Sequence, residues 1–134
     1  MIPTIDDQFL REHDLGVLAA GRRDGSPQLA LVYYHYDGHD IVISTRRDRP
    51  QWHNLGRQPR AACLVQDGRR YVLVYGVAER LDADPARLDA TRRIAFFRTM
   101  HPQDIDDDAA LAAQLDADQR GILRITPDKI VSRA

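Results

Sequence analysis

The amino-acid sequence predicts a small, mainly β domain: an antiparallel barrel, closed or nearly closed, flanked by short helices. Three Asp-Gly pairs, at residues 24–25, 37–38 and 67–68, separate apolar runs of strand length. Asp-Gly is a pair that tight hairpin turns prefer, because these turns need positive φ angles. With 134 residues, 43% of them hydrophobic, the chain has the size and apolar content of one domain with its own core. We therefore expect residues 1–134 to form a single domain.

The apolar runs between these turns define the expected strands, at residues 15–20, 27–36, 40–45, 61–66 and 71–80. Tight turns between successive strands predict an antiparallel meander. Gly76 lies inside the longest run, where a glycine is typical of a β-bulge or a bend. Near the C-terminus we expect a strand at 121–125, a turn at Thr126-Pro127-Asp128 and a further run at 129–132.

Four segments are expected to be helical. Ile5, Phe9 and Leu10 recur at near-helical spacing after Thr4, which suits an N-cap. Residues 50–55 and 108–115 resemble two further short helices. The fourth helix begins at Asp84-Pro85, and positions 88, 91, 94, 95 and 98 keep helical spacing. It should end near His101-Pro102, because the residue before a proline avoids the α region.

Composition excludes several classes of function. The net charge of −1 gives no overall basic field, so we expect no nucleic-acid partner. No apolar run approaches a membrane-spanning length, and the N-terminal residues do not form a secretory signal. Cys63 is the only cysteine, which fits a reducing compartment. We expect a cytoplasmic protein. The acidic stretch 104–118 could be a lid, a partner surface or a solvated helix, and the solvated helix is favoured.

The stretch 41–60 is the strongest candidate for a binding site. An apolar strand is followed by Ser44 and Thr45, and then by a helix-like run among five arginines, at positions 46, 47, 49, 57 and 60. Helix N-termini and guanidinium groups both present donors to phosphate oxygens. This pattern favours an anion site, and a solvated loop with surface arginines is an equal alternative on residue types alone.

Other candidate residues have simpler explanations. The five histidines lack metal-ligand spacing, so no metal site is expected. Cys63 lies in an apolar run and is expected to pack as a small hydrophobe. Strand alternation places Tyr34 and Tyr36 on one face and Tyr33 and His35 on the other, so one face could be core and the other a wall for a flat ligand. Trp52 either covers a ligand or packs its helix against the barrel.

The order of these features resembles the flavin/deazaflavin oxidoreductase superfamily, with its pyridoxamine-phosphate-oxidase-like split barrel. Four segments carry the resemblance: LGVLAAGRRDGSPQLALVYYHYDG, the strand IVIST, RPQWHNLGRQPRAACLV and YVLVYGVAERL. The most specific combination is Asn-Leu-x-Arg-x-Pro-Arg at 54–60, then an apolar strand, then Val-x-Gly-x-Ala-Glu at 74–79. The resemblance implies a six- or seven-stranded antiparallel split β-barrel that forms a homodimer. It also implies FMN or the deazaflavin coenzyme F420, bound non-covalently at the dimer interface.

The resemblance also implies which residues bind the cofactor. The family often has Arg-x-Lys ahead of the Asn-Leu pair, to hold the phosphate; Arg49 matches the arginine, and Gln51 replaces the lysine. A glutamine carries no charge, so phosphate affinity should fall unless Arg46 or Arg47 compensates. Tyr71 would reach the ring from the other protomer. The full set of implied cofactor-binding residues is Leu31, Val32, Tyr33, Tyr34, Ser44, Thr45, Arg46, Arg49, Pro50, Gln51, Trp52 and Tyr71.

The function that the resemblance implies is hydride transfer between reduced F420 (or FMN) and a small organic acceptor. In such enzymes the protein positions and shields the ring while the cofactor carries the electrons. No residue is identified as a general acid, although Tyr34 and His35 are the nearest titratable candidates. One alternative is a non-catalytic protein that binds or stores a flavin, a deazaflavin or a tetrapyrrole. Another is a dimer whose groove stays empty.

Overall fold

The computed structural model describes residues 2–94 and 104–134, which form a seven-stranded antiparallel sheet and four α-helices. The strands are β1 (Leu15–Gly21), β2 (Pro27–Tyr33), β3 (His35–Tyr36), β4 (Ile41–Arg46), β5 (Arg60–Asp67), β6 (Arg70–Leu81) and β7 (Arg120–Arg133). The helices are α1 (Thr4–Glu12), α2 (Pro50–Arg57), α3 (Ala86–Arg93) and α4 (Asp108–Ala117). The predicted fold class, a mainly β split barrel with flanking helices, is confirmed.

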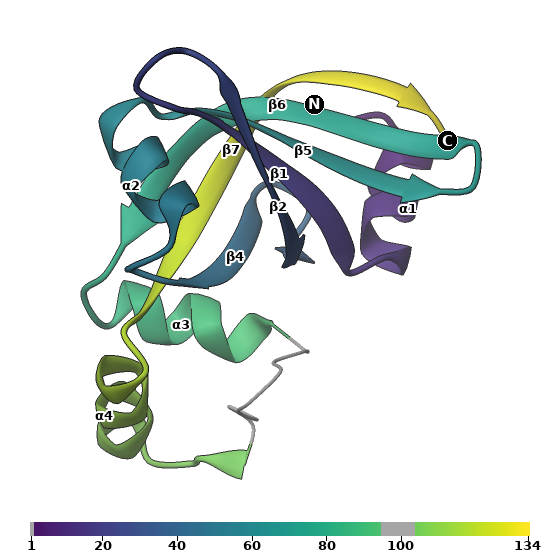
Figure 1. Cartoon of the computed structure of the whole chain (residues 1–134). Helices are drawn as coiled ribbons and strands as arrows, with labels where there is room; N and C mark the ends of the chain where they lie inside the picture. The colour runs from purple at the N-terminus through teal and green to yellow at the C-terminus, as the bar shows by residue number, and fades with distance from the viewer. Residues whose placement is uncertain (1, 95–103) are drawn as a thin grey trace.

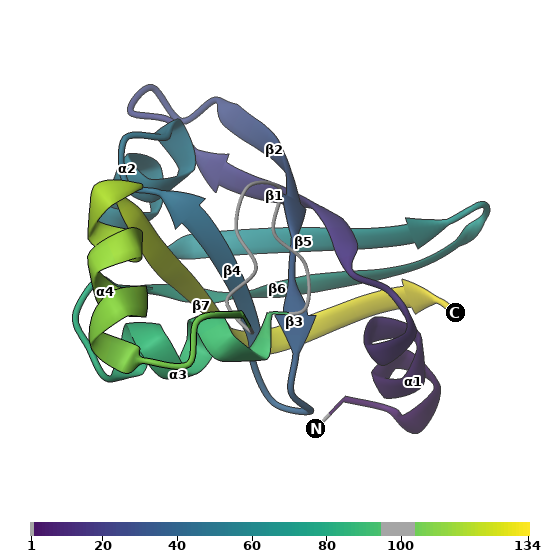
Figure 2. The ribbon, with the colours of Figure 1, turned by 90° about the horizontal axis from the view of Figure 1, so that it is seen from below.

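The sheet curls into a half-barrel because its longest strand joins two parts of it. The strand order is β2-β1-β5-β6-β7-β4-β3. Strand β7 pairs with β6 over residues 122–133 and with β4 over residues 120–125. Figures 1 and 2 place α1 at one end of the sheet, with α2, α3 and α4 toward the other. The strand β2 is an edge, hydrogen-bonded to β1 alone.

The predicted strand at 27–36 is wrong in one respect, because Tyr34 interrupts it. The Tyr34 backbone N–H donates to the Asp14 carbonyl (2.9 Å), and its phenol O–H donates to the Leu10 carbonyl (2.8 Å). Its side chain is buried, so the chain turns inward between β2 and β3. The predicted meander therefore fails here: β3 pairs with β4, whereas β2 does not, and the sheet is split between β2 and β4.

The predicted turn at Thr126-Pro127-Asp128 is also wrong, since β7 continues through these residues. Tyr75 pairs with Lys129 and Gly76 pairs with Pro127, so Asp128 is an extra residue in a bulge. The bulge predicted at Gly76 is confirmed. A Cβ at Gly76 would overlap the Thr126 carbonyl oxygen, which explains why a glycine occupies this position.

Helix α3, which was predicted to begin at Asp84-Pro85, ends earlier than the spacing of its apolar residues predicted. Its last residue is Arg93, and Ile94 has extended backbone angles (φ −77°, ψ 117°). The remainder of the predicted helix, to His101-Pro102, lies outside the described residues. The other three predicted helices are confirmed within two residues at each end. The acidic α4 packs against α3 and β7, with Leu111 and Leu115 buried, so one face of the acidic stretch is core.

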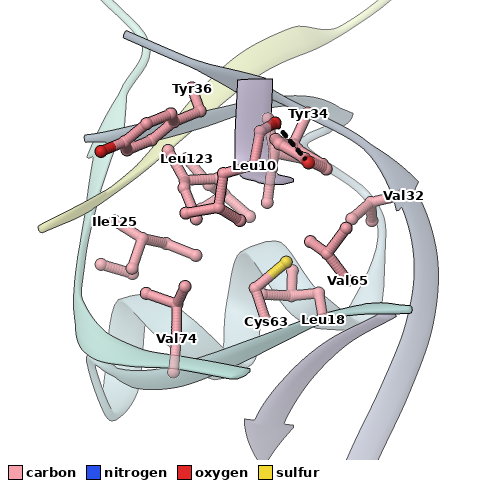
Figure 3. Packing of buried hydrophobic residues seen from close by; sticks show 14 of the residues in the cluster. Leu10, Leu18, Val32, Tyr34, Tyr36, Cys63, Val65, Val74, Leu123 and Ile125 are labelled. Carbon is pink, nitrogen blue, oxygen red and sulfur yellow. Dashed lines mark hydrogen bonds between the residues drawn. The ribbon is translucent and has the colours of Figure 1, made fainter. Parts of the chain in front are cut away.

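Two apolar clusters hold these layers together. The larger lies inside the half-barrel and includes Leu10, Leu18, Cys63 and Leu123, all 1% exposed or less (Figure 3). The smaller, around Leu88, Leu111, Leu115, Val42 and Ile122, packs α3 and α4 against the sheet. Burial raises the pKa of the Cys63 thiol to about 12. Cys63 is therefore a packed apolar residue, as its sequence context indicated.

Candidate functional site

A groove of about 620 Å³ opens where the sheet is split, between β2 and the segment that joins β4 to α2. One wall consists of Leu15 and residues 28–33 of β2, and the other of residues 44–46 and 49–51. Two residues from distant parts of the chain complete it: Ile94, directly after α3, and Arg120, the first residue of β7.

One part of the groove is apolar. Leu29 and Leu31 on β2 are 65% and 71% exposed, and the buried Val32 and Ile94 also line the groove. An edge strand with two such exposed leucines is unusual for a free sheet edge. This wall suits the face of a flat, largely apolar ring.

The other part of the groove is cationic. Arg46 and Arg120 are paired residues in the antiparallel β4–β7 ladder, and Arg49 follows three residues after Arg46. Like charges directly opposite each other destabilise a sheet. Such an arrangement is typical of a site that binds an anion, where the ligand supplies the missing negative charge.

The environment of Arg120 reflects this crowding. Burial lowers the pKa of its guanidinium, the nearby Asp118 raises it, and Arg46 and Arg49 lower it further. Arg46 has an exposed partner, Asp48, at 2.8 Å. Among residues 2–94 and 104–134, neither Arg49 nor Arg120 makes an ion pair. Nearby Asp118 therefore offsets part of the Arg120 charge without forming an ion pair with it among the described residues.

Two hydroxyls of β4 lie next to these arginines. The Ser44 Oγ is buried and has no hydrogen-bond partner among the described residues. Thr45, by contrast, accepts a hydrogen bond from the Gln51 amide nitrogen at 3.0 Å. Buried polar atoms are nearly always hydrogen-bonded. Ser44 lines the groove, and its buried hydroxyl has unused hydrogen-bonding capacity among the described residues.

The chemistry of this set fits a flavin phosphate. An apolar wall suits the ring, a hydroxyl lies beside it, and three guanidinium groups can hold the phosphate. The helix α2 begins here, with Pro50 at its first turn and Arg49 as its N-cap. Its peptide dipoles add positive potential at the same end.

The groove brings together most of the residues that the resemblance implied. Lining it are Leu31, Val32, Tyr33, Ser44, Thr45, Arg46, Arg49, Pro50 and Gln51. Tyr34, Trp52 and Tyr71 do not line it. Tyr34 is buried in the larger core, where desolvation raises the pKa of its phenol, so it faces away from the groove.

Trp52 packs α2 onto the sheet. Of the two roles considered for it, covering a ligand or packing its helix against the barrel, the structure shows the second. Its ring lies against Gly121, where an added Cβ would come within 2.5 Å of it, and the Arg80 guanidinium lies 5.3 Å from a Trp52 ring centroid. Tyr71 lies on the outer face of β6, opposite Arg133 of β7. A role for Tyr71 at the groove of a partner subunit remains a prediction.

The sequence interpretation missed six groove residues. Three precede Leu31 on β2, namely Gln28, Leu29 and Ala30, and three lie on other parts of the chain, namely Leu15, Ile94 and Arg120. Arg120 is separated from Arg46 by more than seventy positions, and only the β4–β7 pairing brings them together. A signal was present, since Arg120 directly precedes the expected strand at 121–125. Its partner strand, however, could not be chosen from sequence.

A second cavity, of about 840 Å³, lies beside the groove, and Gln28 and Pro50 belong to the walls of both. The turn between β1 and β2 forms one side of it, and α2 with Arg80 forms the other. We call this second cavity the basic cleft, because Arg22, Arg23, Arg57 and Arg80 line it.

Two further features bear on the class of protein. Within the described residues, no three histidine, cysteine, aspartate or glutamate side chains gather as metal ligands would. None of the described helices is both long and apolar enough to span a bilayer.

The fold and the groove define a class of protein, and comparison with known families agrees. The model of the pyridoxamine 5'-phosphate oxidase family matches residues 6–133, so the chain belongs to this family. An F420 reductase of known structure is 26% identical, with a TM-score of 0.71; the match covers 97% of this chain and 98% of that one.

Two further solved structures are similar. A conserved hypothetical protein from Mycobacterium tuberculosis is 25% identical, with a TM-score of 0.77, and the match covers 98% of this chain and 84% of that one. A haem storage protein from Vibrio cholerae shares the fold at 12% identity, with a TM-score of 0.71 and 96% and 92% of the two chains covered. The fold therefore occurs in proteins with different ligands.

Proposed function

We propose that the protein is an oxidoreductase that binds F420 or FMN in the groove between β2 and β4 and transfers hydride to a small organic acceptor. The observation that carries the proposal is the pair Arg46–Arg120, opposed across a ladder and joined by Arg49 in the wall of a groove that Leu29 and Leu31 also line. The family membership and the similarity to an F420 reductase support the same ligand class.

In this proposal each part of the groove has a defined task. A bound flavin or deazaflavin supplies the hydride chemistry. Arg46, Arg49 and Arg120 hold the anionic group, and Ser44 donates or accepts one hydrogen bond that the described residues leave open. Leu29, Leu31 and Val32 exclude water from one side of the ring.

The proposal includes a homodimer, because the sheet has a second apolar face. Leu31, Val17, Leu64, Leu73 and Val131 are successive cross-strand partners on β2, β1, β5, β6 and β7. We call this row the outer apolar face. Its members are exposed or half-buried, while their neighbours along each strand, such as Leu18, Cys63 and Val74, fill the core.

A second copy of the chain is the occupant that this face suits. Leu31 belongs both to the outer apolar face and to the groove, so a partner seated on the face would also border the ligand. Tyr71 and Tyr75 flank the row on β6, which would bring them near the partner's groove.

Leu73→Arg should convert a dimer to a monomer in analytical ultracentrifugation. A wild-type protein that is monomeric at micromolar concentration would remove the dimer from the proposal.

The activity itself is tested by anaerobic turnover. Reduced F420 or reduced FMN should be reoxidised faster with protein than without, in the presence of a panel of quinones and nitroaromatic acceptors. Arg49→Ala should weaken cofactor binding by about 1.5–3 kcal/mol, the range for charged hydrogen bonds. Binding without any acceptor-dependent oxidation would support the non-catalytic alternative instead.

Haem binding is the second candidate, because Tyr33 lines the groove and tyrosine is one of the residues that ligate haem iron. A haem storage protein shares the fold. Titration with haemin should then produce a Soret shift that Tyr33→Phe abolishes. If F420 or FMN displaces haemin, both ligands use the groove and their affinities decide between the two functions.

A further inference from the structure

Two carboxylates lie beside the arginines of the groove, and the first of them is Asp48. Each of its oxygens accepts a hydrogen bond from the Arg46 guanidinium, at 3.1 and 2.8 Å. The two side chains are 49% and 43% exposed, so the pair is weak, and the remaining Arg46 N–H groups can still donate to a ligand. The contact therefore reduces the charge of the site without closing it.

The second carboxylate, Asp118, reaches the same arginines from another part of the chain. It is the C-cap residue of α4, and it accepts a hydrogen bond from the Gln114 side-chain amide at 3.0 Å. The next residue, Gln119, has a left-handed backbone (φ 56°), and its carbonyl accepts a hydrogen bond from the Arg47 N–H at 2.7 Å. This bond ties the turn that carries Asp118 to the end of β4, where the cationic part of the groove begins.

The two carboxylates and the three groove arginines form one electrostatic group. Burial lowers the pKa of the Arg120 guanidinium; Asp118 and Asp48 raise it, and Arg46 and Arg49 lower it. Hydrogen bonds to Asp48 are the main reason that the pKa of the Arg46 guanidinium is raised, and Asp118 raises it further. Three guanidinium charges are therefore set against two carboxylates, which leaves one net positive charge.

We propose that Asp48 and Asp118 set the charge that the groove accepts, so that it selects a cofactor whose phosphate is a diester, with one negative charge, over a phosphate monoester, with two. This inference rests on the proposed function and extends it to the class of phosphate. A second negative charge on the ligand costs more to desolvate and gains little from a site with one net positive charge. Among the described residues neither carboxylate lines the groove, so each acts through the arginines.

The test compares FMN with its phosphate monomethyl ester by flavin fluorescence titration. At about pH 8 the phosphate of FMN carries two negative charges, because its second pKa is about 6, and the ester carries one. The test variants are Asp48→Asn and Asp118→Asn, each of which removes one negative charge with little change of shape. Asp48→Glu keeps the charge. Asp106→Asn is the matched control, because Asp106 is exposed and precedes α4, at the end of the helix away from Asp118.

Wild type should bind the ester at least as tightly as FMN. Asp48→Asn and Asp118→Asn should each raise FMN affinity about fivefold and ester affinity about twofold, because a dianion responds more strongly when a nearby negative charge is removed. Asp48→Glu and Asp106→Asn should keep the wild-type ratio of the two affinities, and the FMN gain should shrink as salt is raised.

The ratio of the two affinities distinguishes charge selection from a structural role, which would change both affinities alike. Equal changes for FMN and the ester in Asp48→Asn and Asp118→Asn would overturn the proposal. So would a gain of the same size in Asp106→Asn, or a wild-type preference for FMN over the ester of more than about threefold.

Small phosphates separate failure of this inference from failure of the proposed function. Dimethyl phosphate carries one negative charge and methyl phosphate carries two at about pH 8. Titrated without any flavin, both should shift the backbone amide NMR signals of residues 46–49 and 120. If wild type binds neither flavin but binds dimethyl phosphate at least as tightly as methyl phosphate, and Asp48→Asn reverses this order, the charge assignment stands and the flavin assignment is wrong. If both flavins bind and the aspartate variants leave their affinity ratio unchanged, the charge assignment is wrong and the groove assignment stands.

Discussion

Arg46 and Arg120 are directly opposite each other in the β4–β7 ladder, although both side chains are cationic. Cross-strand partners normally attract or pack, and two like charges in this relation cost roughly 0.2–1 kcal/mol. Arg46 has Asp48 as an exposed partner, whereas Arg120 has no ion pair among the described residues. In the proposed function an anion binds between the two guanidinium groups and removes this repulsion.

The first prediction follows from this relation. Arg120→Gln should leave the free energy of unfolding unchanged or raise it by up to about 1 kcal/mol without ligand, because a repulsion is removed. The same change should weaken FMN binding by about 1.5–3 kcal/mol. Urea unfolding and flavin fluorescence titration measure the two effects. A large loss of stability would show that Arg120 serves the fold rather than the ligand.

Ser44 gives a second prediction, because its buried hydroxyl lacks a partner within the described residues. Ser44→Ala should not destabilise the protein, since no hydrogen bond within the chain is lost. It should weaken FMN binding by about 0.5–1.5 kcal/mol, the range for one neutral hydrogen bond. Thr45→Val is the control, and it should lower stability because the buried Gln51 amide loses its acceptor. Unchanged FMN affinity in Ser44→Ala would place the hydroxyl outside the site.

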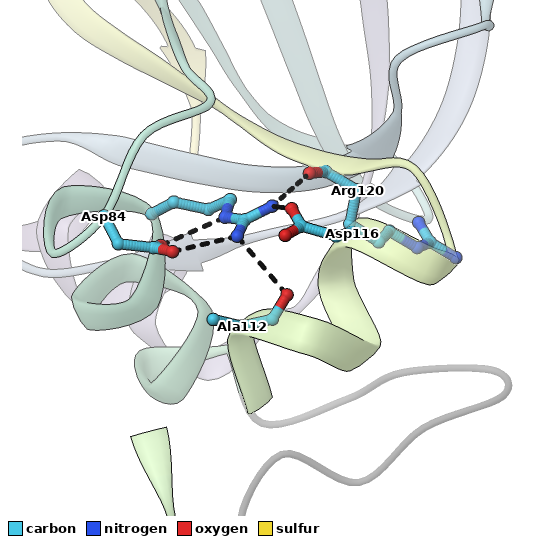
Figure 4. Close-up of polar contacts among 5 residues, drawn as sticks. Asp84, Ala112, Asp116 and Arg120 are labelled. Atoms are coloured by element: carbon cyan, nitrogen blue, oxygen red, sulfur yellow. Dashed lines mark hydrogen bonds and ion pairs between the residues drawn. The ribbon is translucent and has the colours of Figure 1, made fainter. Parts of the chain in front are cut away.

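Arg87 anchors the layer that carries Arg120. Its buried guanidinium donates to both oxygens of Asp84, at 3.0 and 2.9 Å, to Asp116 at 2.8 Å and to the Arg120 carbonyl at 3.3 Å (Figure 4). One side chain therefore joins α3, α4 and the start of β7. Both carboxylates keep some contact with water, so they remain solvated if the arginine is removed.

Arg87→Met should destabilise the protein by about 2–4 kcal/mol, less than the loss of a fully buried pair. Arg92→Met is the matched control, because Arg92 joins α3 to Asp108 and the Ile105 carbonyl with a more exposed side chain. Its loss should cost about 1 kcal/mol. Urea unfolding followed by circular dichroism checks both values, and equal costs would mean that burial of Arg87 is not the source of its effect.

His13 predicts a pH dependence of stability. Its ring nitrogens contact the Phe9 carbonyl at 2.7 Å and Asp67 at 3.1 Å, and the carbonyl contact is the main reason that the pKa of the imidazole is raised. A raised folded-state pKa means that protonation stabilises the fold. The contribution is therefore fully present below the unfolded-state pKa of about 6.5 and is lost as pH rises through the folded-state value.

The effect should be small, below about 1 kcal/mol, because the Asp67 partner is exposed. Free energies of unfolding between pH 5.5 and 8.5 should fall more steeply for wild type than for His13→Gln. His53→Gln, at an exposed histidine, is the control and should keep the wild-type slope. Parallel curves for wild type and His13→Gln would contradict the assignment.

The sequence predicted the local parts of this fold better than its long-range pairings. Asp-Gly turns and apolar runs located the hairpins, and Gly76 located the bulge, because these features depend on neighbouring residues. Pro127 suggested a turn, yet the pairing of β7 with β6 overrides that preference by placing the proline at a bulge. Tyr34 looked like a strand residue, and its burial against Leu10 ends the strand.

The candidate site was predictable where it lies within one stretch of chain. Residues 44–46 and 49–51 face the groove together because β4 leads directly into α2. Arg120 was not predictable, because its position depends on which strand pairs with β4. Arg120 lines the same groove as Gln51, the residue that replaces the lysine often found in the family. The compensation expected from Arg46 or Arg47 therefore has a third candidate on another strand.

The most direct test of the central claim is to compare FMN with riboflavin, which differ only by the phosphate, in wild type and in Arg46→Gln/Arg120→Gln. Flavin fluorescence titration should show that wild type prefers FMN by at least about tenfold, a difference of 1.4 kcal/mol. In the variant the two affinities should become nearly equal, because riboflavin uses only the apolar wall. Equal affinity of wild type for the two flavins, or no binding of either, would contradict the claim that these arginines hold a flavin phosphate.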